Sequence, residues 1–176
     1  MKIHELMTKD VKACGPQDTL NTAAHLMWAN DCGCVPVIDA DGHLQGMLTD
    51  RDICMAAYTC GAPLDELHVA SAMSTNVYTV APHETLARAE QVMAEHQVRR
   101  LPVVGETGRL VGLISLNDLA QVAARDTGRL RPAVSARELS TALGAICKPR
   151  VCPITDAPTP GHPSSTVHEG ELVVTS

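Results

Sequence analysis

The order of apolar and polar positions over residues 18–57 predicts a helix, a β-hairpin and a second helix. Apolar residues at positions 20, 23, 24 and 27 have the spacing of a helix with one buried stripe, and Asp18 or Thr19 supplies its N-cap. Two short apolar runs, 35–38 and 44–48, flank a polar turn that contains Gly42, which predicts a β-hairpin. A second helix is expected over residues 50–57.

The same pattern returns 66 residues later without a gap. Positions 3–53 contain 13 identities with the positions 66 residues further on, among them Pro36/Pro102, Gly46/Gly112 and Asp52/Asp118. The second copy predicts a helix from residue 86, hairpin runs at 101–104 and 110–114, and a helix over 117–125. The chain therefore contains one unit twice.

Each unit is expected to have the order βαββα, with a short first strand at Val11 in one copy and at 77–80 in the other. One unit of about 60 residues buries too little surface to be comfortably stable alone. We therefore predict two units packed sheet to sheet, residues 1–66 and 67–126, with 58–67 as the linker around Gly61 and Pro63.

The remainder of the chain has no counterpart in the first repeat. Ser135 and Glu138 have the spacing of a capping box, and apolar residues at 139, 142, 143 and 146 predict an amphipathic helix within residues 127–148. This helix is expected to cover an edge of the module or a dimer interface. Residues 149–176 hold five of the eleven prolines, so we expect them to be disordered.

Composition excludes several classes of function. The net charge is −6 and aromatic residues make up 2%, so neither a basic face nor a base-stacking surface for nucleic acid is expected. No apolar run reaches the ~20 residues that span a bilayer, and residues 1–8 lack the apolar core of a secretory signal. We expect a cytoplasmic protein, with its seven cysteines reduced.

Several short stretches carry a family resemblance. They are residues 6–8, 35–38, 46–52, 72–74, 100–104 and 112–118. Repeated at a constant offset, they resemble a tandem pair of cystathionine-β-synthase (CBS) domains over roughly residues 1–125. Residues 46–53 and 96–103 also resemble the small stand-alone CBS-pair proteins of the hypoxic-response type. The resemblance implies an α/β fold with pseudo-twofold symmetry, and two chains associated as a homodimer.

The residues 49–52, Thr-Asp-Arg-Asp, follow a predicted strand and open a helix. A hydroxyl and free backbone N–H groups at a helix N-terminus suit a phosphate or ribose oxygen, and Asp52 is spaced to accept both ribose hydroxyls. Arg51 adds a phosphate contact. The same spacing is typical of an ordinary capping box, so ligand contact and helix capping both remain open. Ser115 and Asp118 repeat the pair.

The resemblance implies two nucleotide clefts between the repeats. Cleft A, the hollow around Thr49 and Asp52, takes Val77, Arg99, Arg100 and Pro102 from the second repeat. Cleft B, the hollow around Ser115 and Asp118, takes Val11, Cys34 and Pro36 from the first. Because Arg99 and Arg100 correspond to Gly33 and Cys34, we expect cleft A to bind a phosphate-bearing ligand and cleft B to bind weakly or not at all.

The resulting function is a non-enzymatic regulatory sensor. The ligand is an adenosine nucleotide (AMP, ADP or ATP) or S-adenosylmethionine, the regulated partner is a separate chain, and no cofactor or metal is required. No catalytic motif such as G-x-S-x-G or a phosphate-binding loop is present. Two alternatives remain. One is a stress-associated structural or partner-binding protein with empty clefts. The other is a thiol- or zinc-responsive protein using Cys32, Cys34 and Cys147, with His25 as a further candidate zinc ligand beside Cys32 and Cys34.

Overall fold

The computed structural model describes residues 1–125 and 134–149. The predicted disordered tail beyond residue 149 lies outside these residues, as do residues 126–133. The first half contains a short 3-10 helix η1 (Ile3–Glu5), helix α1 (Leu20–Ala29), strands β1 (Cys34–Ile38) and β2 (Leu44–Thr49), and helix α2 (Asp50–Cys60). The second half contains helices α3 (Val69–Ala72) and α4 (Leu86–His96), strands β3 (Arg100–Val104) and β4 (Leu110–Ser115), and helices α5 (Leu116–Arg125) and α6 (Ala136–Ile146).

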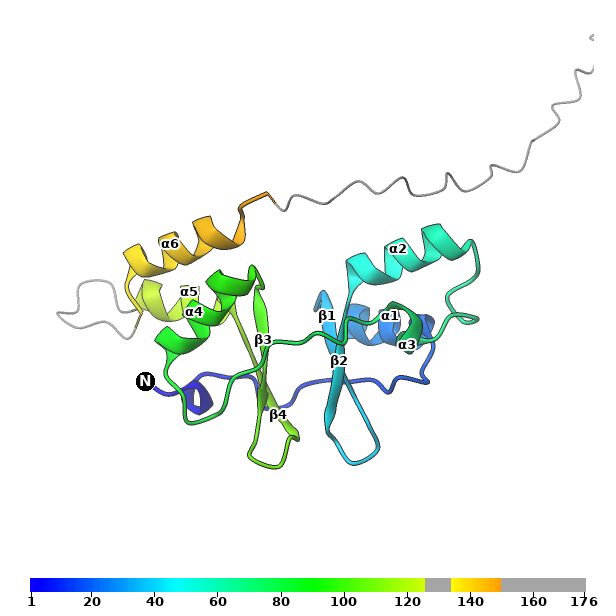
Figure 1. The fold of residues 1–176 in the computed structure, drawn as a ribbon, viewed down its shortest axis with the longest axis horizontal. Helices are drawn as coiled ribbons and strands as arrows, with labels where there is room; N and C mark the ends of the chain where they lie inside the picture. Colours follow the sequence, from blue (N-terminus) through cyan, green and yellow to red (C-terminus); the bar gives the residue numbers. More distant parts are fainter. Residues whose placement is uncertain (126–133, 150–176) are drawn as a thin grey trace, which may run out of the picture.

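Two antiparallel hairpins with matching register lie next to each other in the middle of the molecule, and the helices lie on the outer sides (Figure 1). β1 pairs with β2 so that Cys34 is opposite Thr49, and β3 pairs with β4 so that Arg100 is opposite Ser115. The expected α/β repeat is confirmed. The first strand of each unit is reduced to a single parallel bridge, Cys14 to Val37 and Val80 to Val103.

The two halves exchange their first segments. Ile3 of η1 is fully buried in the hydrophobic cluster of the second half, together with Leu86 and Met93 of α4. Conversely, Val69 of α3 is fully buried in the cluster of the first half, beside Leu20. Figure 1 shows η1 beneath α4 and α5, whereas α1 and α2 lie in the opposite half. The apolar cores therefore remain separate, and chain exchange links them.

Backbone bridges fix this exchange at two equivalent points. Thr8 and Leu113 exchange two hydrogen bonds of 2.9 Å, and Ser74 and Met47 exchange bonds of 2.8 and 2.9 Å. A glycine lies beside each bridge. A Cβ on Gly46 would stand 2.9 Å from the carbonyl oxygen of Ser74, and a Cβ on Gly112 would stand 2.9 Å from the carbonyl oxygen of Thr8. Only a residue without a side chain permits so close an approach.

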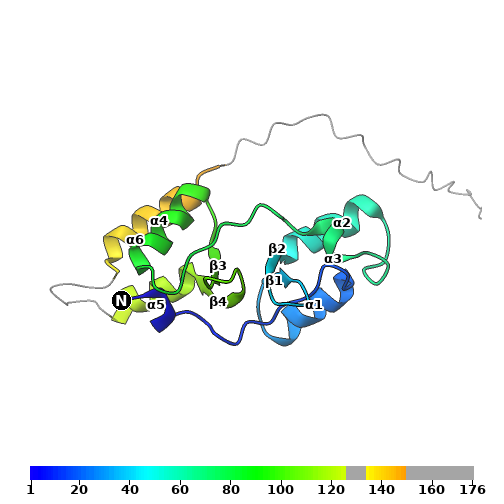
Figure 2. The same cartoon turned by 60° about the horizontal axis from the view of Figure 1, so that its bottom comes forward.

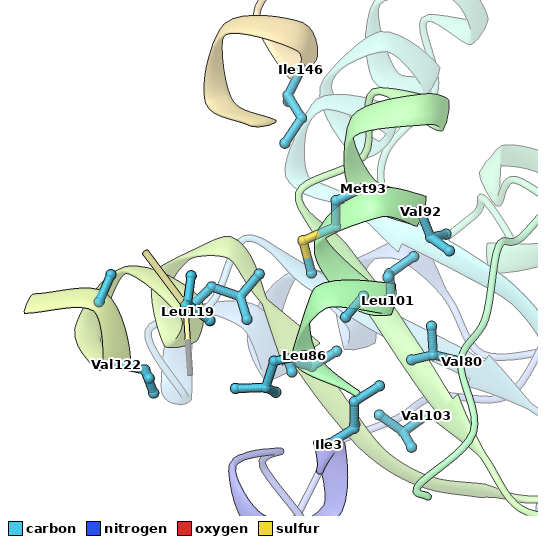
Figure 3. Close-up of a cluster of buried hydrophobic side chains, with 14 residues drawn as sticks. Ile3, Val80, Leu86, Val92, Met93, Leu101, Val103, Leu119, Val122 and Ile146 are labelled. Atoms are coloured by element: carbon cyan, nitrogen blue, oxygen red, sulfur yellow. The ribbon is translucent and has the colours of Figure 1, made fainter. Parts of the chain in front are cut away.

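Helix α6 covers the helices of the second half. It packs along α4 and α5 (Figures 1 and 2). Ile146 enters the same apolar cluster as Met93 (Figure 3). Its N-terminus is the predicted capping box, in which Ser135 Oγ accepts from the Glu138 N–H and Glu138 Oε2 accepts from the Ser135 N–H. The helix thus extends the core of one half only.

The expected linker begins later than the sequence pattern indicates. α2 continues through Tyr58 to Cys60, and Gly61 ends it in the left-handed conformation at φ 63°. The apolar stripe of this helix is short, so its last turn carries no signal in the hydrophobic pattern. The connection to α3 is correspondingly shorter than residues 58–67.

We expect Gly46→Ala to destabilise the protein. The new Cβ would collide with the Ser74 carbonyl at the bridge between the halves, and overpacking of this kind costs about 1–3 kcal/mol. Gly144→Ala is the matched control, because nothing lies within 4 Å of its Cβ position and alanine favours a helix. Urea unfolding measures both. Equal stability of the two variants would show that the bridge does not require glycine.

Glu90 at the α4–α6 contact predicts a pH effect. Burial and the nearby Glu138 charge raise the pKa of this carboxyl. The folded-state pKa lies above the unfolded-state value, so ionisation of Glu90 lowers the stability of the fold. This loss of stability is absent at low pH and develops as pH rises from the unfolded-state pKa through the folded-state pKa. Glu90→Gln should therefore raise the melting temperature at about pH 7 and change it little at about pH 4. An equal increase at both pH values would contradict this cause.

Candidate functional site

A hollow of about 610 Å³ lies between the two halves at the N-terminus of α2. It is cleft A, since its lining includes Thr49, Arg51, Asp52, Val77, Arg99 and Arg100. These residues come from α2 and the end of β2 in one half, and from the segments before β3 and the first residue of β3 in the other. The volume falls in the range of small-molecule sites, about 300–1,000 Å³.

Thr49 and Asp52 form a complete capping box in the lining of cleft A. The Thr49 N–H and hydroxyl donate to Asp52 Oδ2 over 2.9 and 2.7 Å, and the Asp52 N–H donates to Thr49 Oγ1 over 3.2 Å. Within residues 1–125 and 134–149, Oδ1 of Asp52 accepts no hydrogen bond. The capping interpretation is therefore confirmed, and it leaves one carboxylate oxygen available to a ligand.

Three arginines bring positive charge to the hollow. Arg51, Arg99 and Arg100 are exposed. None of them takes part in a salt bridge within the described part of the chain. The acidic residues of the lining are Asp50 and Asp52, and Asp50 Oδ1 accepts from the Arg51 N–H over 2.8 Å. Cleft A thus offers guanidinium groups with unused donors beside the carboxylates of Asp50 and Asp52.

The hairpin register places Cys34 in cleft A rather than in cleft B. Because Cys34 is opposite Thr49 in the first hairpin, the thiol lies on the side of Thr49. The thiol is buried, and burial raises its pKa, although the Arg100 charge acts in the opposite direction. The assignment of Cys34 to the second cleft is corrected on this ground.

The same register changes the predicted composition of cleft B. A hollow beside Ser115 is lined by Arg99, Arg100 and Asn117, together with Leu139 and Leu143 of α6. Arg100 is opposite Ser115 in the second hairpin, so the two arginines line both hollows. The expectation that they belong to cleft A alone is wrong. Val11, Pro36 and Asp118 are not part of this lining, and Asp118 instead caps α5 through Ser115.

The two prolines expected in the clefts have a structural place in the strands. The Pro36 carbonyl accepts from the Cys14 N–H over 3.1 Å, and the Pro102 carbonyl accepts from the Val80 N–H over 3.2 Å. Both prolines are buried. Pro102 does not line cleft A. These residues hold the short first strand of each unit rather than contact the hollow.

Several lining residues of cleft A were not found from the sequence. Tyr78 lines the hollow and its ring stacks on His96, with centroids 3.6 Å apart and planes 9° apart. Gln97 and Ile146 line it as well, and Ile146 comes from α6. The capping box at Ser135 predicts that helix, but no sequence pattern shows where the helix lies.

The arrangement of thiols and histidines does not form the zinc site considered above. In the described part of the chain, one group of three possible metal ligands has its ligand atoms within 4.8 Å of one another. It consists of Asp39, Asp41 and His43. That group lies at the turn of the first hairpin and contains neither Cys32 nor Cys34. The cysteine–histidine combination that zinc favours is therefore not assembled at this point.

A family model for the CBS domain matches residues 3–58 and again residues 69–125. The chain belongs to the CBS domain family. The two matched segments correspond to the internal repeat, and α6 lies beyond the second match. The residues that form cleft A therefore lie within a CBS domain pair, apart from Ile146 of α6.

Two curated relatives and one solved structure show how far the likeness extends. The CBS domain-containing protein YhcV of Bacillus subtilis is 40% identical over 118 residues, 67% of this chain and 82% of that protein. Hypoxic response protein 1 of Mycobacterium tuberculosis is 35% identical over 117 residues, 66% of this chain and 81% of that protein. A crystal structure of Hypoxic Response Protein I with two coordinated zinc ions has a TM-score of 0.63 and 34% identity, covering 69% of this chain and 98% of that one.

Within residues 1–125 and 134–149, no helix is both long enough and apolar enough to cross a membrane.

The buried cysteines are expected to react with alkylating reagents more slowly than the exposed ones. Burial, with a smaller contribution from Asp18, raises the pKa of Cys14 to about 11, and burial also raises the pKa of Cys34. Because the thiolate is the reactive form, iodoacetamide at about pH 8 should modify the exposed Cys54 and Cys60 well before Cys14 and Cys34. Peptide mass spectrometry at timed intervals measures the order. Modification of Cys14 as fast as Cys54 would contradict it.

Proposed function

We propose that the protein is a non-enzymatic sensor that binds an adenosine nucleotide in cleft A. The observation that carries this proposal is the set of three exposed arginines, outside any described salt bridge, in a hollow whose lining also includes the Asp52 carboxylate. Nucleotides combine the two matching groups, because their phosphates need cationic donors and their ribose needs an acceptor for its hydroxyls.

The geometry suggests how the two ends of the ligand are divided. Phosphate oxygens accept from the guanidinium groups of Arg51, Arg99 and Arg100, which line the hollow. The ribose hydroxyls donate to Oδ1 of Asp52, which accepts no hydrogen bond from the described residues. Capping of α2 and ligand binding then use different oxygens of the same carboxylate, so both functions coexist.

The residues that line the two clefts favour cleft A as the nucleotide site. Both contain Arg99 and Arg100, but Arg51 of cleft A corresponds to Asn117 in cleft B. Cleft B also has Leu139 and Leu143 of α6 in its lining, and Asp118 is not part of it. A polyanion is therefore better matched by cleft A.

Two neighbours of the same fold agree with this class of ligand. One is described as the CBS domain pair of MJ0100 in complex with 5′-methylthioadenosine and S-adenosyl-L-methionine, and another as CBSX2 in complex with AMP. Their sequence identities are 20% and 23%, which establish the common fold alone. In this chain, the arginines and Asp52 of cleft A supply the groups that match such a ligand.

Signalling is proposed to pass to a separate regulated protein, with the sensor acting as a homodimer. A ligand changes such an assembly only by binding one of its states better than the other. Cleft A lies between the two halves, so a ligand that contacts α2 and the residues before β3 is suited to report on their relative position. The competing proposal is a structural or partner-binding protein whose clefts stay empty.

Titration calorimetry and thermal shift with AMP, ADP, ATP and S-adenosylmethionine test the proposal. A ligand at 100 times its dissociation constant should add about 2.7 kcal/mol of stability. The double variant Arg99→Ala/Arg100→Ala should bind the phosphorylated ligand at least about tenfold more weakly, because charge-assisted hydrogen bonds contribute about 1.5–3 kcal/mol. Asp52→Asn should weaken binding of every adenosine ligand.

Arg109→Ala is the matched control. Arg109 is an exposed arginine at the turn of the second hairpin, at the opposite end from Arg100. Its loss should leave affinity unchanged. The absence of heat and of any thermal shift with all four ligands would support the empty-cleft alternative. Unchanged affinity in the double arginine variant would place the ligand elsewhere.

A further inference from the structure

Helix α6 reaches both hollows of the second half. Its last residue, Ile146, lines cleft A, whereas Leu139 and Leu143 line cleft B. Between these contacts the helix packs along α4 and α5 (Figures 1 and 2). α6 lies beyond both segments that match the CBS domain. A helix outside the matched domain pair therefore forms part of the wall of the proposed ligand site.

Gln97 joins the end of α6 to the end of α4. It is the C-cap residue of α4, and its side-chain Nε2 donates to the carbonyls of Ala145 and Lys148 over 3.1 and 3.2 Å. Carbonyl groups in the last turn of a helix lack the usual partners within it, so an external donor stabilises that end. Gln97 also lines cleft A. The residue that holds the end of α6 is thus itself part of the ligand site.

The backbone of Gln97 adopts the left-handed conformation, at φ 54°. Its counterpart in the first repeat, Asp31, has φ 48°, so this conformation belongs to the repeated unit. Aspartate and asparagine are the residues other than glycine that adopt positive φ most readily. The second repeat therefore has the less favourable residue at this position, and its longer side chain is the one that reaches α6.

Ile146 belongs both to the core of the second half and to the wall of cleft A. It is buried in the same apolar cluster as Met93, above which it lies in Figure 3, and it lines the hollow. Val98, which follows Gln97, packs against this cluster and lines the hollow as well. A ligand on this side of cleft A buries further apolar surface of Ile146, and that surface is in place only while α6 is docked.

The contact between α6 and α4 also includes an unfavourable pair of charges. A hollow of about 570 Å³ lies along the two helices, and Glu90 and Glu138 both line it. Burial raises the pKa of Glu90, and the charge of Glu138 raises it further. An isolated helix shorter than ~12–15 residues is marginal in water, and α6 has 11. Docking of α6 is therefore opposed near its N-terminus and supported at its other end, where Gln97 and Ile146 meet cleft A.

We propose that α6 reports the occupancy of cleft A, because a ligand bound there increases the fraction of chains in which α6 is docked against α4. The inference rests on the proposed function, since it requires an adenosine ligand in cleft A, and it specifies which element of the chain responds. A ligand that contacts Ile146 and Gln97 binds the docked state better than the undocked one, which is the condition for shifting the equilibrium. The coupling is reciprocal, so loss of docking weakens the ligand by the same factor. Gln97 is the positioning residue of this coupling.

Hydrogen–deuterium exchange of the full chain, with and without saturating AMP or ATP, measures the docking of α6. The ligand should slow exchange of residues 140–147 by at least about fivefold relative to α1, at the lower end of the coupling found between sites. α1 is the internal reference, because none of its residues lines cleft A.

The variant Gln97→Asn tests the positioning residue without a ligand. Asparagine adopts the left-handed conformation, but its shorter side chain does not reach the two carbonyls of α6. Exchange of α6 in the ligand-free variant should be about twofold to tenfold faster than in the wild type, the range expected for lost hydrogen bonds.

Calorimetry on two variants of α6 tests the reciprocal effect. Ala142 is buried, lines the hollow beside Glu90 and Glu138 and lies outside the lining of cleft A. Ala142→Glu should therefore undock the helix and weaken the ligand at least about fivefold. Ser140→Glu is the matched control, because it adds the same charge at an exposed position of the same helix, and it should leave the affinity unchanged. Cooperative urea unfolding verifies that each variant folds.

Failure of the coupling and failure of ligand binding give different results. The absence of heat with both AMP and ATP in the wild type would overturn the nucleotide site and the coupling together. Heat of binding with no difference in exchange between α6 and α1, or with unchanged affinity in a folded Ala142→Glu, would overturn the coupling alone. If Ala142→Glu does not fold, exchange in the wild type and in Gln97→Asn decides between the two outcomes.

Discussion

The exchange of first segments between the two halves is the constraint on which the rest of the structure depends. The apolar cluster of each half includes a fully buried residue from the start of the other unit, Ile3 in one case and Val69 in the other. The bridges at Thr8 and Ser74 secure the exchange, and Gly46 and Gly112 permit the close approach. Cleft A forms between the halves because this exchange holds them together.

A repeated unit need not give two equal sites. Both halves carry the same hydroxyl–carboxylate cap, yet Arg51 and Asn117 occupy equivalent positions and α6 lines only the second hollow with leucines. The same helix leaves the α1–α2 face open while it occupies the α4–α5 face. One short element added after the repeat therefore makes the surroundings of the two halves unequal.

Much of the fold follows from local pattern, whereas the membership of each cleft does not. The cap at Ser135 and both hairpins depend on nearby residues and were predicted. The sequence left the first cap open between Asp18 and Thr19, and the structure has Thr19. The predicted cleft residues Thr49, Arg51, Asp52, Val77, Arg99 and Arg100 also come together. Cys34 was misplaced because its position depends on the pairing with Thr49 across the hairpin. The approach of Ile146 to cleft A depends on tertiary packing, which no periodicity records.

The central claim is that the arginines and Asp52 of cleft A bind an adenosine nucleotide. The most direct test is a titration of the isotope-labelled chain with AMP, followed by the backbone amide resonances in two-dimensional NMR. We predict that the largest shifts fall on residues 49–52 and 97–100, which come from the two halves and line one hollow. Shifts confined to other segments, or no shift at saturating AMP, would contradict it.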